Sequence, residues 1–279
     1  MSVNFRLLSD HTGVEVTGVS LLHPLSSELR DRLYRAWLDS AVLVIRDQDL
    51  DPHQLLAAAK QFGEPLHQHN TRFQIKDCPE IHYISNQDKY DDGRRYIPGA
   101  GYHTDHSNAE YPPKATILHA KVLPKTGGDT QFVNMARAFE TLDKGTREII
   151  EGLKAEHVYQ SSHSSRKLVG LTEKRKAQIE QSVVHPLVRT HDETGRQAIY
   201  INPIRIEQII GMSNKDALPL LDRLLDHAIQ PTHEYRHKWR NGDFVMWDNR
   251  VLLHKANPDY DMQEMRYLFR LMLQGARPH

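Results

Sequence analysis

Residues 101–108 (GYHTDHSN) hold two histidines and an aspartate within four positions. If this segment is extended, side chains two apart leave the same face about 6.6 Å from each other at Cα, so His103 and Asp105 can converge on one ion while Thr104 and His106 point away. An imidazole nitrogen and a carboxylate oxygen together suit Fe(II), Mn(II) or zinc. The pair alone is a weak signal, because the chain contains 18 histidines.

A second segment whose residues could bind a metal or take part in catalysis lies far downstream, at 242–260 (GDFVMWDNRVLLHKANPDY). A strand pattern there ends in a polar Asp-Asn turn, and His254 follows among apolar residues. Because this histidine is surrounded by residues that belong in a core, it is a candidate for a buried role.

The strand pattern RYLFRLML (266–273) carries two arginines on one face, with Leu268 and Met272 beside them. A strand that is largely apolar on both faces is buried, and buried arginines require anionic partners. Arg266 and Arg270 stand roughly 13 Å apart at Cα, which suits two separate anions better than one. The alternative is that each pairs with a structural acid, for which Asp248 or Glu264 would serve.

A third segment, LPKTGGDTQF (123–132), places two glycines at a turn and begins a strand at Thr130. The hydroxyl of Thr130 could hold a carboxylate oxygen. On its own, this pattern indicates only a turn.

Composition limits the class of protein. The 279 residues include 36 basic and 36 acidic side chains and one cysteine, so neither nucleic-acid binding nor a disulfide framework is indicated. The start has no basic region followed by an apolar run, and no apolar stretch reaches the about 20 residues of a membrane span. We therefore expect a cytoplasmic protein with neither a nucleic-acid nor a membrane partner.

The elements that must position these side chains form a mixed α/β pattern. Helices are predicted at 26–40, with Ser26 or Ser27 as the N-cap, and from Asp51, as the N-cap, to Gly63, with a buried strand between them. Residues 64–102 are predicted to be loops around a short strand, IHYIS. Beyond 103, short strands alternate with helical segments at 134–152 and 203–229, and a mobile flap is predicted at 161–178. This order favours a double-sheet jelly roll with flanking helices over a doubly wound parallel sheet.

We predict one domain over 1–279. Residues 1–100 supply α/β elements and active-site loops, and residues 101–279 supply the jelly-roll core.

Together, the stretches 103–132 (HTDHSNAEYPPKATILHAKVLPKTGGDTQF) and 247–260 (WDNRVLLHKANPDY), followed by Arg-x-x-x-Arg, resemble the TauD/TfdA family of iron(II)- and 2-oxoglutarate-dependent dioxygenases. The likeness extends over most of the chain. It implies three ligands to iron, namely His103, Asp105 and His254.

The resemblance also implies roles for four further residues. Thr130 and Arg266 would hold the distal carboxylate of 2-oxoglutarate. Arg270 would receive the anionic head of the substrate, and His69, in FGEPLHQH, would contact it.

The implied reaction follows from this ligand set. Three protein ligands leave three positions on the metal, two for 2-oxoglutarate and one for O2. Decarboxylation to succinate and CO2 would be coupled to oxidation, typically hydroxylation, of a C–H bond in a small anionic molecule such as a sulfonate or carboxylate. Family members commonly self-associate, so a homo-oligomer is an expectation as well.

Two other classes of protein are alternatives. A zinc hydrolase is suggested because HTDH resembles the end of an H-x-H-x-D-H motif, but Gly101 stands where the first histidine belongs, and the two arginines would go unexplained. A non-catalytic metal- or ligand-binding barrel is the second. The triad with Thr130 and two arginines is more than such a protein requires.

Overall fold

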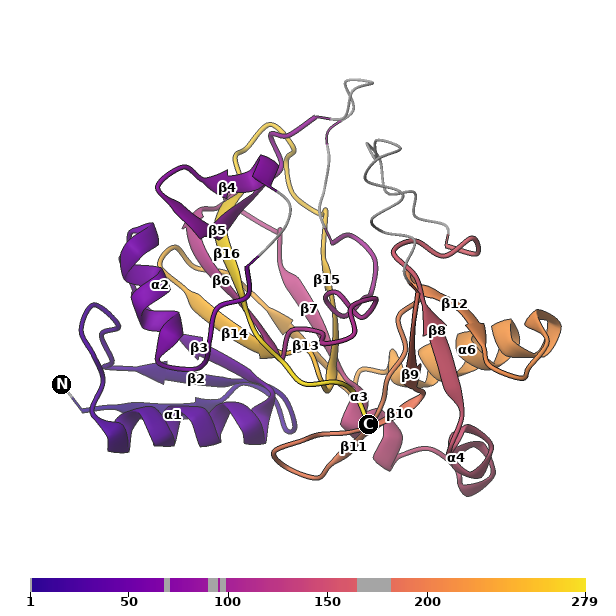
Figure 1. Ribbon diagram of the computed structural model, residues 1–279. Helices are drawn as coiled ribbons and strands as arrows, with labels where there is room; N and C mark the ends of the chain where they lie inside the picture. The colour runs from indigo at the N-terminus through magenta and orange to yellow at the C-terminus, as the bar shows by residue number, and fades with distance from the viewer. Residues whose placement is uncertain (1, 68–70, 90–94, 96–98, 165–181) are drawn as a thin grey trace.

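The computed structural model describes residues 2–67, 71–89, 95, 99–164 and 182–279. Its centre is a sheet of eight strands in the order β1-β2-β3-β14-β6-β16-β5-β4 (Figure 1). Among the strands of the described residues, only β2 and β3 pair in parallel. The strands of this major sheet are β1 (Asn4–Leu7), β2 (Val14–Thr17), β3 (Val42–Ile45), β4 (Gln74–Ile75), β5 (Cys78–Ser85), β6 (Ala115–Val122), β14 (Phe244–Asp248) and β16 (Tyr267–Leu273).

Three smaller sheets complete the strand framework, in the orders β13-β7-β15, β12-β8-β9 and β10-β11. The first packs against the major sheet through Phe132, whose ring meets Trp247 of β14 edge-on at 5.5 Å between centroids. This double-sheet core is the predicted jelly roll. The strands are β7 (Thr130–Asn134), β8 (Lys154–His157), β9 (Val183–Pro186), β10 (Val188–Thr190), β11 (Gln197–Ile199), β12 (Ile206–Ile209), β13 (Glu234–His237) and β15 (Leu252–Ala256).

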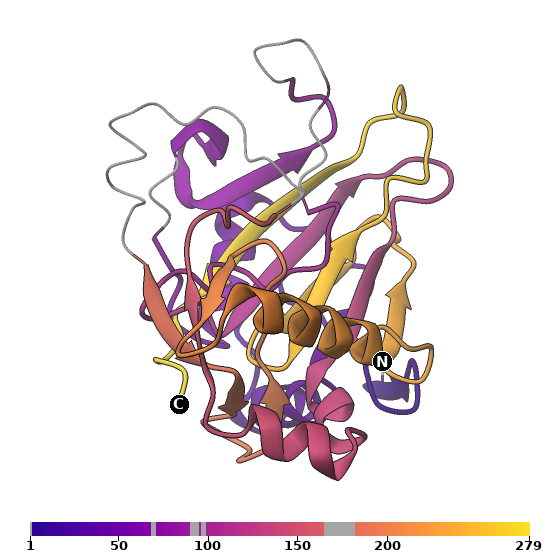
Figure 2. The same ribbon diagram turned by 90° about the vertical axis from the view of Figure 1, so that its right-hand side faces the viewer.

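Helices flank this core on two sides. The helices α1 (Ser27–Ser40) and α2 (Pro52–Lys60) lie against one face of the major sheet, where α1 buries Leu33 and Trp37. On the other side of the molecule, α4 (Lys144–Ile150) and α6 (Asn214–Ala228) lie near each other (Figure 2), with α3 (Met135–Glu140) beside them. A short 3-10 helix, η1 (Thr71–Phe73), precedes β4.

The two N-terminal helices confirm the sequence prediction down to their caps. Ser26 accepts a hydrogen bond from Leu29 N–H, and Asp51 forms a reciprocal capping box with Gln54. Such caps satisfy backbone donors that a helix start leaves unpaired, so the cap residues fix where each helix begins.

Two of the predicted helical segments need correction. The segment 134–152 is two helices, because Asp143 accepts from Thr146 N–H and starts α4 anew. The prediction of one helix over 203–229 is wrong in its first third: β12 pairs there with β8, Gly211 takes a positive φ of 80°, and α6 begins only at Asn214. Pairing with β8 buries Ile206 and Ile209, which outweighs the local helical pattern.

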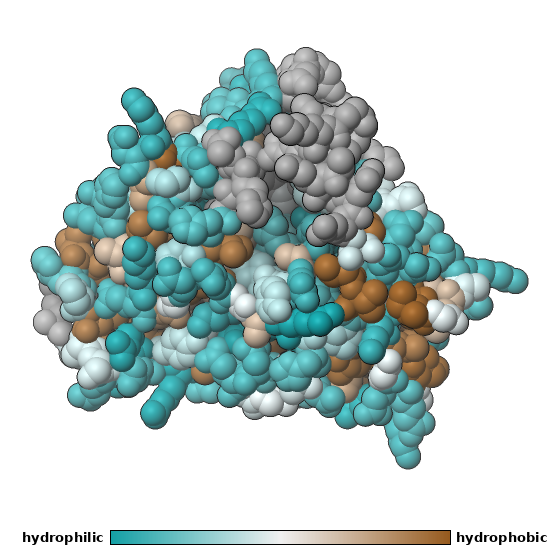
Figure 3. Space-filling view, in the orientation of Figure 1, coloured by the Kyte–Doolittle hydropathy of each residue, from teal (hydrophilic) through white to brown (hydrophobic). Residues whose placement is uncertain are grey.

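The exterior visible in Figure 3 is largely hydrophilic, with an apolar stretch on the side of β8 and β9. Val184 of β9 is among the exposed large hydrophobic residues. Among the helices of the described residues, none combines the length and the apolar character that a membrane span requires.

The turn between β14 and β15 contains a fully buried arginine. Arg250 donates two hydrogen bonds to Asp248, at 2.9 and 2.7 Å, and others to Asp192 and Glu193 of the loop after β10. Its guanidinium carbon also lies 5.3 Å from the ring centroid of Trp37 in α1. One side chain thus ties the turn to α1 and to the β10–β11 hairpin.

Replacing this arginine should strongly destabilise the fold. We expect Arg250→Ala to lower the free energy of unfolding by about 3–5 kcal/mol, because it leaves Asp248 buried without its charge partner. Urea unfolding of the apoprotein measures the loss. Lys144→Ala, which removes a surface ion pair with Glu148, should cost less than about 1 kcal/mol. Equal effects of the two substitutions would contradict the role assigned to Arg250.

Candidate metal centre

The histidines at positions 103 and 254 are joined through their backbones. His103 N–H donates to His254 C=O at 3.0 Å, and His254 N–H donates to His103 C=O at 2.8 Å, as an isolated antiparallel bridge. This pairing brings the two imidazole rings to 4.2 Å between centroids. The loop before β6 is thereby fastened to β15 at the point where both histidines project.

Asp105 completes a cluster of three potential metal ligands. One ligand atom from each of His103, Asp105 and His254 lies within 4.8 Å of the other two. The Nε2 atoms of both histidines stand 3.8 Å from the Asp105 carboxylate, His103 facing Oδ1 and His254 facing Oδ2. These distances are too long for hydrogen bonds, so the donor atoms face one another across a gap. The structure therefore brings together the three residues that the sequence singled out.

The protonation states suit a metal ion. His103 Nδ1 lies 2.8 Å from the carbonyl oxygen of Gly101, which can only accept, so in the neutral imidazole Nδ1 carries the proton and Nε2 is the unprotonated nitrogen. Burial lowers the pKa of His254 to about 3 and keeps it neutral. Burial alone would raise the pKa of Asp105, but His254, His103 and Arg270 bring it below its ordinary value. Neutral imidazoles and an ionised carboxylate are the forms that bind metals.

The orientation of His254 depends on aromatic neighbours. Its ring lies 4.7 Å from Trp247 and 6.3 Å from Phe132, centroid to centroid, and its buried Nδ1 has no hydrogen-bond partner among the described residues. His106 takes a left-handed backbone with φ of 47° and does not belong to the three-residue cluster.

A second group of residues surrounds Arg266, which is 6% exposed. Its Nε donates to Gly128 C=O at 3.0 Å, and its guanidinium carbon lies 6.0 Å from the ring centroid of Trp239. Trp239 in turn donates from Nε1 to Thr130 Oγ1 at 3.0 Å. Burial lowers the pKa of Arg266, and no carboxylate of the described residues forms an ion pair with it. A buried guanidinium in this state is a candidate site for an anion. No pattern in the sequence signalled the contact of Trp239 with Thr130.

Arg270 lies in β16 opposite His82 of β5. Its charge contributes to lowering the pKa of Asp105 and of His254. Burial, and then Arg270, lower the pKa of His82 to about 4.

The predicted alternation in β16 is confirmed. Leu268 joins the core between the sheets, while Phe269, Leu271 and Leu273 join the core under α1 and α2. The two acids that could have been structural partners of the arginines bond to other groups: Asp248 to Arg250, and Glu264 to the backbone N–H of Lys125.

Two sequence predictions concern residues that are not described. His69 lies outside the described residues, and so does most of the predicted flap at 161–178.

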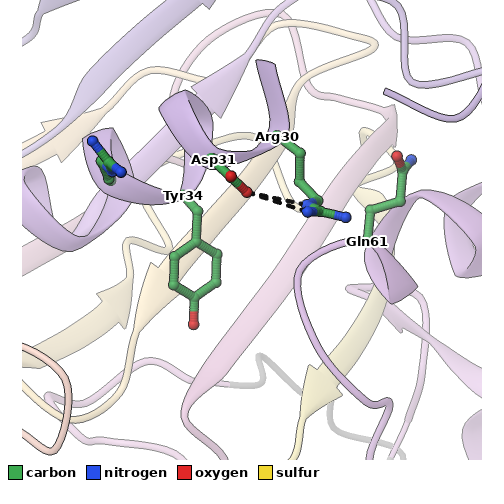
Figure 4. A pocket seen from close by; sticks show the side chains of 5 residues that line it. Arg30, Asp31, Tyr34 and Gln61 are labelled. Atoms are coloured by element: carbon green, nitrogen blue, oxygen red, sulfur yellow. Dashed lines mark hydrogen bonds and ion pairs between the residues drawn. The ribbon is translucent and has the colours of Figure 1, made fainter. Parts of the chain in front are cut away.

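A surface hollow of about 280 Å³ lies on α1, away from this cluster, and is lined by Arg30, Asp31, Tyr34, Arg35 and Gln61 (Figure 4). In it, Arg30 pairs with its neighbour Asp31. None of the three potential metal ligands lines it, so it is not part of the candidate centre.

The fold and the cluster define a jelly-roll protein with a two-histidine, one-carboxylate centre, an arrangement typical of non-haem oxygenases. Residues 4–272 match the family model described as "Taurine catabolism dioxygenase TauD, TfdA family". The chain belongs to this family. The predicted family, fold class and enzyme class (a dioxygenase, hence an oxidoreductase) are confirmed, and membership implies 2-oxoglutarate, O2 and a metal ion.

Individual relatives agree with this placement. The chain is 34% identical to the alpha-ketoglutarate-dependent 2,4-dichlorophenoxyacetate dioxygenase of Burkholderia sp. (strain RASC), over 99% of this chain and 96% of the relative. It is 32% identical to the (S)-phenoxypropionate/alpha-ketoglutarate-dioxygenase of Sphingobium herbicidovorans, over 94% and 92%. The crystal structure of AAD-2 in complex with Mn(II) and N-oxalylglycine superposes with a TM-score of 0.84 at 32% identity, covering 100% of this chain and 99% of that one.

Proposed function

We propose that this protein is an Fe(II)- and 2-oxoglutarate-dependent dioxygenase that oxidises, typically by hydroxylation, a C–H bond of a small organic anion. The observation that carries the proposal is the convergence of His103, Asp105 and His254 at 4.8 Å or less. Iron(II), when bound there, supplies the activation of O2 and the electron transfer that side chains cannot provide. His103 and His254 would bind it through Nε2, and Asp105 through a carboxylate oxygen.

Arg266 and Thr130 would bind the distal carboxylate of 2-oxoglutarate. The Nε of Arg266 is committed to Gly128 C=O, which leaves the two terminal nitrogens as donors to a carboxylate. Thr130 Oγ1 accepts from Trp239 Nε1, so its own proton remains to be donated. Both groups therefore offer donors, as a carboxylate requires.

Arg270 would bind the anionic group of the substrate. Its planar, permanently charged guanidinium suits a carboxylate or a sulfonate, and the names of the two curated relatives describe phenoxy acids.

His69 remains a proposed substrate contact. A cytoplasmic location, one domain, the absence of a nucleic-acid partner and a homo-oligomer belong to the same proposal. Composition supports the first three of these, and the family resemblance supports the last.

The first test is metal dependence. The wild-type protein should consume 2-oxoglutarate only with Fe(II), and His103→Ala, Asp105→Ala or His254→Ala should reduce succinate formation below detection, because each removes a ligand. Succinate release measured under O2 decides this. Full activity in His254→Ala, with the loss appearing instead in His106→Ala, would refute the ligand set.

The second test concerns 2-oxoglutarate. Arg266→Ala should weaken its binding by about 3–5 kcal/mol, the scale for breaking a buried charge pair. Gly128→Ala should also raise the KM for 2-oxoglutarate, because an added Cβ would stand 3.2 Å from Cδ and Nε of Arg266.

Gly152→Ala is the matched control for this second test. Gly152 has a similar positive φ, of 79° against 72° for Gly128, but open space around its Cβ position. Both glycine variants should lose about 1 kcal/mol of stability, and only Gly128→Ala should change the KM for 2-oxoglutarate. An unchanged KM in Arg266→Ala, with the loss found in Arg270→Ala, would show that the two arginines have exchanged roles.

The third test concerns the charge of the substrate. Arg270→Leu should strongly raise the substrate KM while uncoupled decarboxylation of 2-oxoglutarate continues, because binding of the substrate anion is what is removed. The control is Arg277→Leu, which removes an exposed arginine paired with Glu110 and should leave the KM unchanged. A preferred substrate without an anionic group, oxidised equally well by Arg270→Leu, would assign Arg270 a structural role.

A further inference from the structure

The carboxylate of Asp105 is held by a threonine of the major sheet. Thr116 of β6, which is fully buried, donates from Oγ1 to Asp105 Oδ2 at 2.6 Å. The same Oγ1 accepts from Asn249 Nδ2 at 2.9 Å. An amide nitrogen only donates, and a threonine hydroxyl has one proton. The proton of Thr116 is therefore committed to Asp105.

The direction of the hydrogen bond from Thr116 to Asp105 depends on two further residues, Asn249 and Trp247. Trp247 donates from Nε1 to Asn249 Oδ1 at 3.1 Å. An indole N–H cannot accept, so the oxygen of the Asn249 amide must face Trp247 and its nitrogen must face Thr116. The Asn249 backbone carbonyl also accepts from Thr104 Oγ1 at 2.8 Å. The hydrogen bonds thus run in one direction, from Trp247 through Asn249 and Thr116 to Asp105.

We propose that Thr116 is a positioning residue for the metal centre, with Asn249 acting through it. By binding Oδ2, Thr116 holds the carboxylate plane with Oδ1 toward Nε2 of His103 and Oδ2 toward Nε2 of His254. Oδ1 is the proposed ligand atom, because Thr116 already occupies Oδ2. Asp105 lies in the loop before β6 and belongs to no strand, so this contact supplies the orientation that regular backbone pairing does not. The inference rests on the proposed function, since it assigns Asp105 to a metal.

The test is Mn(II) binding to the metal-free full-length protein without 2-oxoglutarate, followed through the electron paramagnetic resonance signal of free Mn(II). Thr116→Val keeps the shape of the side chain and removes the donor, and Thr116→Ala removes the hydroxyl without adding a methyl group beside the carboxylate. Loss of such a supporting contact typically weakens metal binding about 10- to 100-fold. Thr116→Ser keeps the donor and should bind Mn(II) within about threefold of the wild type, if the same scale applies.

Controls separate this inference from the proposed function. Thr12→Val removes another buried hydroxyl, one bonded to Asn134, and should leave Mn(II) binding unchanged. Urea unfolding of each metal-free variant establishes that it is folded, and Thr116→Ala replaces Thr116→Val if the latter is not. If the wild type and His103→Ala bind Mn(II) alike, the proposed metal centre itself is wrong.

Two results would overturn the positioning role while leaving the metal centre intact. One is Mn(II) binding by both hydroxyl-free variants as tight as in the wild type. The other is binding by Thr116→Ser as weak as in Thr116→Val, which would assign the effect to packing of the methyl group rather than to the hydrogen bond.

Discussion

The buried ion pair between Arg250 and Asp248 is the constraint on which the rest of the site depends. It closes the turn between β14 (Phe244–Asp248) and β15 (Leu252–Ala256), and so fixes the path of the chain between the two strands. Asn249, inside the turn, directs Thr116 toward Asp105, and His254, four residues beyond Arg250, enters the cluster from β15. A desolvated charge pair costs free energy to bury, and this one fixes two of the three potential ligands relative to each other.

The third ligand depends on a different kind of contact. His103 lies outside the strands of the sheets and is fastened by two backbone hydrogen bonds to His254. Its ring is then oriented by the carbonyl of Gly101. Because these partners are backbone groups, they restrict the backbone conformation of residues 101–105 more than the identity of their side chains. The centre thus combines two potential ligands from the loop before β6, His103 and Asp105, with one from β15, His254.

Local patterns in the sequence predicted the parts of the structure that depend on local physics. Helix starts followed from the capping residues Ser26 and Asp51, and the two faces of β16 followed from alternation. The beginning of α6 did not, because β12 is stabilised by pairing with the distant β8. The role of Thr116 could not be predicted from the sequence either. Thr116 lies opposite Trp247 because of the register in which β6 pairs with β14, and neither segment alone determines that register.

The wide separation of the ligands along the chain has a consequence for how the protein is maintained. His103 and His254 are brought together by contacts between segments far apart in the chain, and proteins rich in such non-local contacts fold slowly. An ion held by this cluster binds the native chain and not the unfolded one, so it stabilises the native state by mass action. If the cluster holds its metal as proposed, the supply of metal would affect the lifetime of the protein as well as its turnover, because chains without metal would unfold more often and be exposed to proteases.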